Sequence, residues 1–216
     1  MMGEHLSFCV PYGDPRADTV LLQIVDRRDL TNMEAEAKEL SDALGRPFLL
    51  LCYPVENWNR DLSPWQAPPI FGSEPFSGGA DHTLKTITER ILPACGEKSV
   101  YLGGYSLAGL FSLWASYQTD RFKGVCAASP SVWYPGWMDF AVSHRPRTER
   151  IYLSLGDREE HAKNRVLATV GNCIRTQYAF LSEQGISATL EWNRGNHFQN
   201  AEQRTAKGFV WLLEHS

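Results

Sequence analysis

Short apolar runs alternate with amphipathic stretches along most of the chain. Six runs have the length and composition of buried strands: residues 19–25, 47–53, 98–103, 122–129, 151–155 and 187–192. Five stretches have a helical pattern: residues 31–44, 81–92, 107–117, 164–184 and 205–213. A capping box of Thr31 and Glu34 predicts where the first helix begins, and Gly45 predicts where it ends. Apolar strands that alternate with helices indicate an α/β fold, with a mostly parallel sheet and helices on both faces.

Two segments rich in Trp and Pro interrupt this alternation, at residues 54–80 and 130–137. Long segments without helices or strands are uncommon in compact domains and are usually functional. Ligands of such sheets bind beyond the carboxyl ends of the strands. We therefore expect the loop at 54–80 to lie over the active site. Because no linker or repeat is evident, residues 1–216 are predicted to form a single domain.

Composition narrows the classes to which the protein can belong. Of the 216 residues, 43% are hydrophobic and 21% are charged, which excludes intrinsic disorder as the main state. The net charge of −4 and the lack of a basic stripe argue against nucleic-acid binding. No apolar run reaches the roughly 18 residues that cross a bilayer, and residues 1–10 do not resemble a signal peptide. Five scattered cysteines without a C-x-x-C pair fit reduced thiols, so the expected location is cytoplasmic.

The candidate chemistry starts at Gly103–Gly109, where an apolar strand passes through small residues into an apolar helix. A nucleophile elbow has this context, because a sharp turn must present a serine hydroxyl above the sheet. Ser106 occupies the turn. The residues two before and two after it would crowd each other and must be small, as Gly104 and Ala108 are. The alternative is an ordinary strand–helix turn with an N-cap serine.

A serine nucleophile needs a base, and the base needs an acid that orients it. His197 is the best placed of the six histidines, because it follows the last predicted strand; His161 is its rival. The segment after the fifth strand offers three carboxylates as the acid, namely Asp157, Glu159 and Glu160. All three lie between the serine and His197 along the chain, so the usual order of nucleophile, acid and histidine does not separate them.

An oxyanion hole requires two backbone N–H donors. One is predicted to be the N–H of Leu107, at the start of the helix after the serine. The second is predicted in the loop after the first strand, at Arg27.

Three segments together resemble a known family: Gly104–Phe111, Ala128–Trp133 and Gly195–His197. They are similar to the α/β-hydrolase esterases that include S-formylglutathione hydrolases, feruloyl esterases, siderophore esterases and mycolyltransferases. The resemblance covers most of the chain, from Val20 to Trp211, and implies the α/β-hydrolase fold.

The resemblance also bears on the acid. In this family the acid commonly falls three residues after the glycine that ends the strand, which implies Glu159, with Asp157 as the second choice. Some siderophore esterases of the group lack a well-placed acid, so a Ser–His dyad stays open. Two features depart from the family: Ala108 replaces the usual glycine of the elbow, and Asp26–Arg27 stands where a His-Gly pair is usual.

These features predict a serine hydrolase that cleaves a small-molecule carboxylic ester through an acyl-enzyme on Ser106. The aromatic residues expected in its substrate pocket are Trp58, Trp65, Tyr105 and Trp133, with Phe71 beside them. Two alternatives remain: an acyltransferase that uses the same acyl-enzyme, and a non-catalytic binding module with this fold. Because neither H-E-x-x-H nor clustered His and Cys occurs, no metal and no cofactor is predicted.

Overall fold

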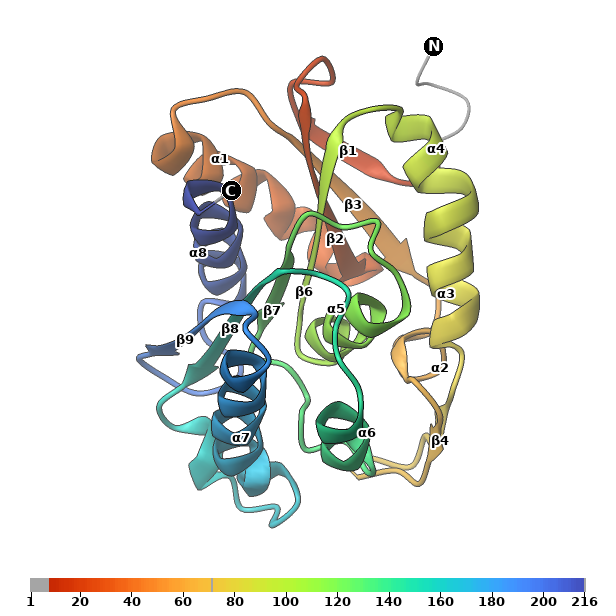
Figure 1. Ribbon diagram of the computed structural model, residues 1–216, viewed down its shortest axis with the longest axis vertical. Coiled ribbons are helices and arrows are strands. Elements are labelled where there is room, and N and C mark those ends of the chain that lie inside the picture. Colours follow the sequence, from red (N-terminus) through yellow and green to blue (C-terminus); the bar gives the residue numbers. More distant parts are fainter. Residues whose placement is uncertain (1–7, 71, 216) are drawn as a thin grey trace.

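The computed structural model describes residues 8–70 and 72–215. Within them, seven strands form a central sheet in the order β1–β3–β2–β6–β7–β8–β9 (Figure 1). The strands are β1 (Val10–Gly13), β2 (Thr19–Asp26), β3 (Leu49–Val55), β6 (Ser99–Tyr105), β7 (Val125–Ala128), β8 (Arg150–Gly156) and β9 (Ser187–Asn193). β1 pairs antiparallel with β3, and the other neighbours pair in parallel. The predicted mostly parallel α/β sheet is confirmed.

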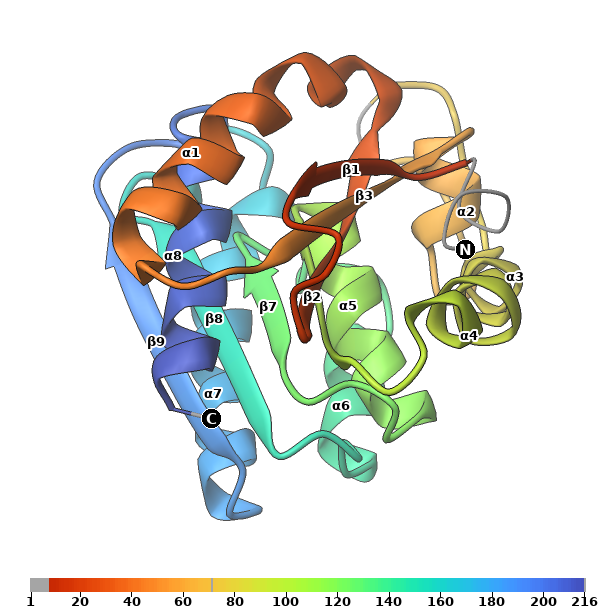
Figure 2. The same cartoon turned by 90° about the horizontal axis from the view of Figure 1, so that it is seen from above.

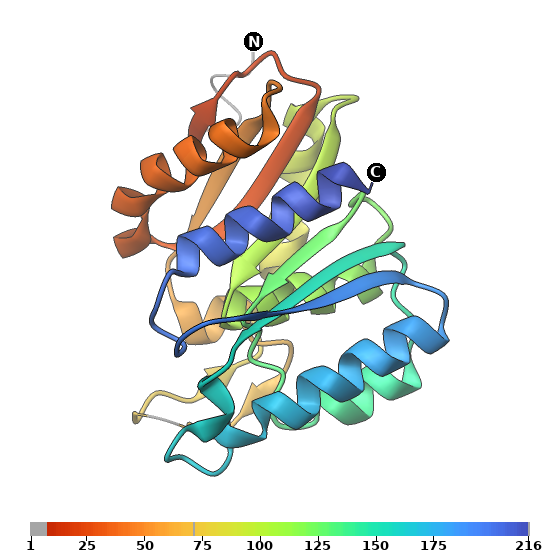
Figure 3. The same ribbon diagram turned by 90° about the vertical axis from the view of Figure 1, so that its left-hand side faces the viewer.

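Helices cover both faces of the sheet (Figures 2 and 3). One face carries α1 (Met33–Leu44) and α8 (Ala201–Glu214). The other carries α3 (Ala80–Thr86), α4 (Leu92–Cys95), α5 (Leu107–Gln118), α6 (Trp137–Ser143) and α7 (Val170–Glu183). In β2, Val20, Leu22 and Ile24 pack into one apolar cluster, while Leu21 and Val25 pack into the other. Burial on both faces explains why these strands are continuously apolar.

The topology reverses between β2 and β6, which are neighbours in the sheet. The chain leaves β2 toward α1 on one face and leaves β6 toward α5 on the opposite face. Two connections that diverge in this way open a crevice at the carboxyl ends of the two strands, where ligands of open α/β sheets bind.

The first helix begins later than predicted. The Asp26 carboxylate accepts the N–H of Arg28 and opens a 3₁₀ turn over Arg27–Asn32, and α1 follows from Met33. Thr31 donates its hydroxyl to the Arg28 carbonyl, so it does not cap the helix and the predicted capping box is wrong. Gly45 ends the helix with φ of 58°, as predicted.

The loop predicted at 54–80 contains more regular structure than expected. β3 runs through Pro54 to Val55, because β1 pairs with β3 only as far as Cys52 and leaves an edge on which proline is tolerated. A short helix and a two-stranded ribbon follow: α2 (Trp58–Leu62), β4 (Gln66–Ala67) and β5 (Phe76–Ser77). Phe71 lies outside the described residues.

Other boundaries also differ from the prediction. The helix expected at 81–92 starts at Ala80 and continues through a π-turn to Cys95, and the one expected at 164–184 starts at Val170. The fourth strand is limited to Val125–Ala128 and the last helix extends over Ala201–Glu214. β1 and α6 were not predicted: Val10–Gly13 contains Pro and Gly, and α6 begins inside a segment whose Pro and Trp content is typical of a loop. Among the described helices, none is both long and apolar enough to span a membrane.

Candidate active site

Ser106 stands at a strained turn between β6 and α5. Its φ of 59° and ψ of −120° are unfavourable for a residue with a side chain. Hydrogen bonds hold it there: its N–H donates to the Ala128 carbonyl at 3.0 Å, and its carbonyl accepts the Ser131 N–H at 3.1 Å. A Cβ at Gly104 would lie 2.6 Å from the Cβ of Ala108, so position 104 must be glycine. With glycine there, the methyl group of Ala108 fits, so alanine can stand where the family that the sequence resembles usually has glycine.

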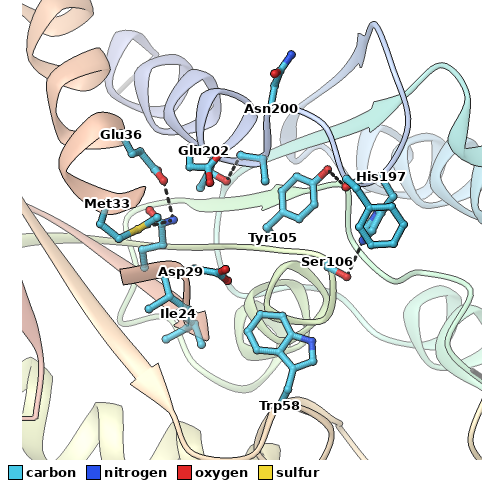
Figure 4. A pocket seen from close by; sticks show the side chains of 15 residues that line it. Ile24, Asp29, Met33, Glu36, Trp58, Tyr105, Ser106, His197, Asn200 and Glu202 are labelled. Atoms are coloured by element: carbon cyan, nitrogen blue, oxygen red, sulfur yellow. Dashed lines mark hydrogen bonds between the residues drawn. The ribbon is translucent and has the colours of Figure 1, made fainter. Parts of the chain in front are cut away.

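Ser106, His197 and Glu159 form a hydrogen-bonded chain, although each comes from a different connection. Ser106 Oγ lies 2.9 Å from His197 Nε2, and His197 Nδ1 lies 2.7 Å from Glu159 Oε2. His197 follows β9, and Glu159 begins a 3₁₀ turn after β8. Figure 4 shows the Ser106 and His197 side chains facing each other at the rim of a cavity. A hydroxyl, an imidazole and a carboxylate in this order can activate the hydroxyl as a nucleophile.

The Glu159 carboxylate is buried and fully hydrogen-bonded. Its side chain is 4% exposed, and its Oε1 accepts hydrogen bonds from Ser129 Oγ (2.8 Å), the Gly156 N–H (2.8 Å) and Arg204 Nη1 (2.9 Å). Burial by itself raises the pKa of Glu159, but the hydrogen bond and charge of His197 and the backbone donor outweigh it and lower the pKa. The carboxylate is therefore ionised at neutral pH and is aimed at the imidazole.

Arg204 on α8 connects the parts of this site, and sequence reasoning missed it. Its buried guanidinium donates to Glu159, to the Tyr105 hydroxyl at 3.0 Å and to the Asn196 carbonyl at 3.0 Å. Tyr105 in turn donates its hydroxyl to the His197 carbonyl at 2.8 Å. Arg204 thus holds both the acid and the loop that carries the imidazole. One sequence signal could have pointed to Arg204: it lies four residues before Gly208, on the side of the last helix that faces the core, where a charged residue is unusual.

The other predicted acids and the rival base lie elsewhere. Asp157 accepts the Gly195 N–H at 2.8 Å and so shapes the loop before His197. Glu160 forms an ion pair with Arg175 at 2.9 Å, and His161 is exposed. Of the three candidate carboxylates, the structure brings Glu159 to the imidazole.

A cavity of about 360 Å³ opens beside Ser106 and His197 (Figure 4). β2 and α1 form one side of it and the start of α8 forms another. Trp58 and Tyr105, both predicted in the substrate pocket, line it, and so does Phe198, whose side chain is 93% exposed. The remaining lining residues are Gln23, Ile24, Val25, Asp29, Met33, Glu36, Asn200, Ala201, Glu202 and Thr205.

Trp65 and Trp133 are not among the residues that line this cavity. Trp65 donates its indole N–H to the Pro135 carbonyl and packs against Tyr134, and Trp133 packs against Phe76. Both side chains thus form contacts between the segment around the β4–β5 ribbon and the loop before α6, and these contacts hold the two segments together. Packing in a loop-rich region explains these tryptophans.

The two predicted oxyanion donors differ in position. Leu107 is the first residue of α5, where a backbone N–H has no acceptor within the helix. Arg27 lines a separate hollow, together with Tyr53 and Arg60, and is not among the residues around Ser106. The second donor at Arg27 stays a prediction.

The wall of the cavity contains a buried acid, Glu36, whose side chain accepts a hydrogen bond from Gln23 Nε2 at 3.0 Å. Burial raises the pKa of Glu36 from 4.5 to about 8, and the charges of Glu202 and Glu39 add to this effect. The folded protein therefore keeps a proton here that the unfolded chain releases above about pH 4.5. The contribution of neutral Glu36 to stability is complete below that pH and is lost as the pH rises through about 8.

Replacing Glu36 with glutamine is expected to remove this part of the pH dependence of stability, because glutamine has no proton to lose. Relative to the wild type, the free energy of unfolding of Glu36→Gln should rise by a few kcal/mol between about pH 5 and pH 9. Urea denaturation at several pH values measures the difference. Parallel curves for the two proteins would contradict the raised pKa.

The sequence matches no protein-family model. It is 25% identical over 152 residues to the uncharacterized protein YbbA of Bacillus subtilis (strain 168), an alignment that spans 65% of this chain and 61% of that protein. The chain thus covers less than two thirds of the length of that relative.

Solved structures give a clearer likeness. The siderophore hydrolase EstA of Aspergillus nidulans matches with a TM-score of 0.74 and 19% identity, over 97% of this chain and 95% of that one. An IroE-like serine hydrolase of Shewanella oneidensis matches with a TM-score of 0.77 and 15% identity, over 95% of this chain and 75% of that one. The enterobactin esterase FES of Shigella flexneri matches with a TM-score of 0.72 and 16% identity, over 96% of this chain and 55% of that one. These neighbours are esterases and serine hydrolases of the α/β-hydrolase superfamily, and the chain has their fold.

Proposed function

We propose that this chain, which has the fold of those hydrolases, is a serine esterase that cleaves carboxylic esters of small molecules. The observation that carries the proposal is the continuous contact from Ser106 Oγ through the imidazole of His197 to Glu159, at 2.9 Å and 2.7 Å. A strained elbow that exposes the hydroxyl beside a cavity supports it further. A non-catalytic module would have no need of either feature.

In the proposed reaction, Ser106 Oγ attacks the ester carbonyl while His197 Nε2 takes its proton. Glu159 holds Nδ1–H and stabilises the imidazolium that forms. The N–H of Leu107 donates to the oxyanion of the tetrahedral intermediate. His197 then protonates the leaving alcohol, and the acyl group stays on Ser106.

Deacylation repeats these steps with water. His197 removes a proton from water, which attacks the acyl carbonyl, and the proton returns to Ser106 as the acid leaves. Arg204 and Tyr105 act as positioning residues, since they contact Glu159 and the His197 carbonyl and not the reacting atoms.

An acyl-enzyme predicts burst kinetics. With p-nitrophenyl acetate in excess, stopped-flow absorbance should record rapid release of about one equivalent of p-nitrophenol per protein, followed by slower steady turnover. The burst amplitude should scale with protein concentration. No p-nitrophenol release above that of a Ser106→Ala control, for any of several p-nitrophenyl esters, would contradict the proposed function.

A further inference from the structure

One end of the cavity is acidic. Asp29 from the 3₁₀ turn after β2, Glu36 from α1 and Glu202 from α8 all line it. Figure 4 shows these three carboxylates together on one side of the cavity, with Ser106 and His197 on the other side. Among the described residues that line the cavity, His197 is the one that can carry positive charge, and the proposed mechanism uses its nitrogen atoms.

The carboxylates influence one another across three elements. Burial raises the pKa of Asp29, and the charges of Asp26 and Glu202 raise it further, while Arg28 lowers it. Arg28 is already paired with Asp26 at 2.8 Å. Glu202 also adds to the raised pKa of Glu36. Glu36 keeps its proton up to about pH 8, so the negative charge at this end of the cavity comes from Asp29 and Glu202. No Lys or Arg is among the described residues that line the cavity, so a positively charged ligand would be favoured beside these two carboxylates.

A second observation comes from hydrogen bonding in the cavity wall. Glu36 and Gln23 are both at least nine-tenths buried, and both line the cavity. Glu36 accepts a hydrogen bond on Oε2, yet Glu36 Oε1 and Gln23 Oε1 have no hydrogen-bond partner among residues 8–70 and 72–215. Buried polar atoms normally have a partner. Gln23 Oε1 is an acceptor at any pH, so it indicates a place for a ligand that carries N–H or O–H groups, whereas Glu36 Oε1 becomes an acceptor when Glu36 is ionised.

A metal ion is a poor fit for this end of the cavity. In the part of the chain that the structure describes, no three His, Cys, Asp or Glu side chains are grouped closely enough to hold one. An ammonium group needs no such tight shell, because it carries three N–H donors and one positive charge. These properties match both the carboxylates of Asp29 and Glu202 and the unpaired acceptor Gln23 Oε1.

We propose that the acidic end of the cavity binds a primary ammonium group of the substrate, so that the enzyme prefers esters bearing an amine to neutral or anionic esters of the same shape. The inference rests on the proposed esterase function and names the substrate class for the same site. Ser106 and His197 act on the ester bond, and Asp29 and Glu202 select the charge of the group beyond it, together with Glu36 where that side chain is ionised.

Esters matched in length but not in charge test the proposal. In the acyl arm, p-nitrophenyl 6-aminohexanoate is compared with p-nitrophenyl heptanoate, in which a methyl group replaces the ammonium, and with mono-p-nitrophenyl adipate, which is anionic. In the alcohol arm, butyrate esters of 6-aminohexanol and heptanol are compared by pH-stat. The ammonium group can lie on the acyl side or on the alcohol side of the ester bond, so we expect a preference in one of the two arms. There, kcat/KM for the ammonium ester should exceed that of the neutral ester by about 10-fold, and this ratio should fall in high salt because salt screens the charges.

Variants of the acidic wall test the cause. Glu202→Gln and Asp29→Asn should each reduce the ratio of kcat/KM for the ammonium ester to that for the neutral ester, by about three- to tenfold. Glu36→Gln should do the same in assays above about pH 8, where Glu36 is ionised. Glu34→Gln is the matched control, because Glu34 is an exposed carboxylate on α1 that does not line the cavity. Its ratio should equal that of the wild type.

The possible outcomes separate the two proposals. Hydrolysis of the neutral esters with no preference for the ammonium esters in either arm would overturn the inference and leave the esterase function standing. A preference that persists in all three wall variants would also overturn it, since the selectivity would then arise elsewhere. Failure to hydrolyse any of these esters would overturn both.

Discussion

Replacing Ser106 with alanine is expected to reduce kcat for p-nitrophenyl butyrate by about 10⁵- to 10⁶-fold, since the acyl-enzyme can no longer form. Alanine also removes the hydroxyl that contacts His197 Nε2 at 2.9 Å. The fold should persist, because the backbone hydrogen bonds of residue 106 and the packing of α5 do not involve Oγ. Steady-state kinetics and thermal melting of the purified variant measure both effects.

Ser131 provides the matched control. Its Oγ lies 3.4 Å from Ser106 Oγ, and its side chain is buried. Ser131→Ala leaves the contact between Ser106 and His197 in place, so it should reduce kcat by no more than about 10-fold, the value of one hydrogen bond. A Ser106→Ala protein that is folded and retains more than a tenth of the wild-type kcat would refute the nucleophile assignment.

Replacing Glu159 with glutamine is expected to have the second-largest effect, a loss of about 10⁴-fold in kcat. The amide of glutamine is nearly the same size as the carboxylate but lacks its charge, so it neither stabilises the imidazolium nor holds the productive tautomer. The change also leaves the buried guanidinium of Arg204 without an anionic partner. Stability should therefore fall by about 3 kcal/mol, which urea denaturation can measure beside the kinetics.

The neighbouring carboxylates serve as controls for this substitution. Glu160→Gln breaks an ion pair with Arg175, and Asp157→Asn preserves an acceptor for the Gly195 N–H. Neither side chain contacts the imidazole, so each variant should stay within about fivefold of the wild-type kcat. If Asp157→Asn or Glu160→Gln lost more activity than Glu159→Gln, the orienting acid would have been assigned to the wrong residue.

Much of this fold was predictable because parallel strands that are buried on both faces must be continuously apolar. The elbow was predictable for a steric reason, since a strand, a serine and a helix in succession require Gly104 to be small. The position of His197 followed from the rule that the carboxyl ends of parallel strands meet at one edge of the sheet. Each of these features is encoded within a few neighbouring residues.

What could not be predicted depends on contacts between distant segments. Three carboxylates follow β8 within four residues, and only the 3₁₀ turn that starts at Glu159 selects the one that faces inward. The role of Arg204 requires α8 to lie against the loops after β7 and β8, which no local pattern records. Trp65 looked like a pocket residue because its loop is irregular, yet its indole N–H is held by the Pro135 carbonyl far along the chain.

Covalent labelling with a fluorophosphonate tests the central claim most directly, because only a serine activated by a base reacts readily with this reagent. Intact mass spectrometry of the wild type should record one phosphonyl adduct, and peptide mapping should place it on Ser106. Ser106→Ala should carry no adduct, and His197→Ala should react far more slowly. An unlabelled wild-type protein, or an adduct on a serine other than Ser106, would contradict the account.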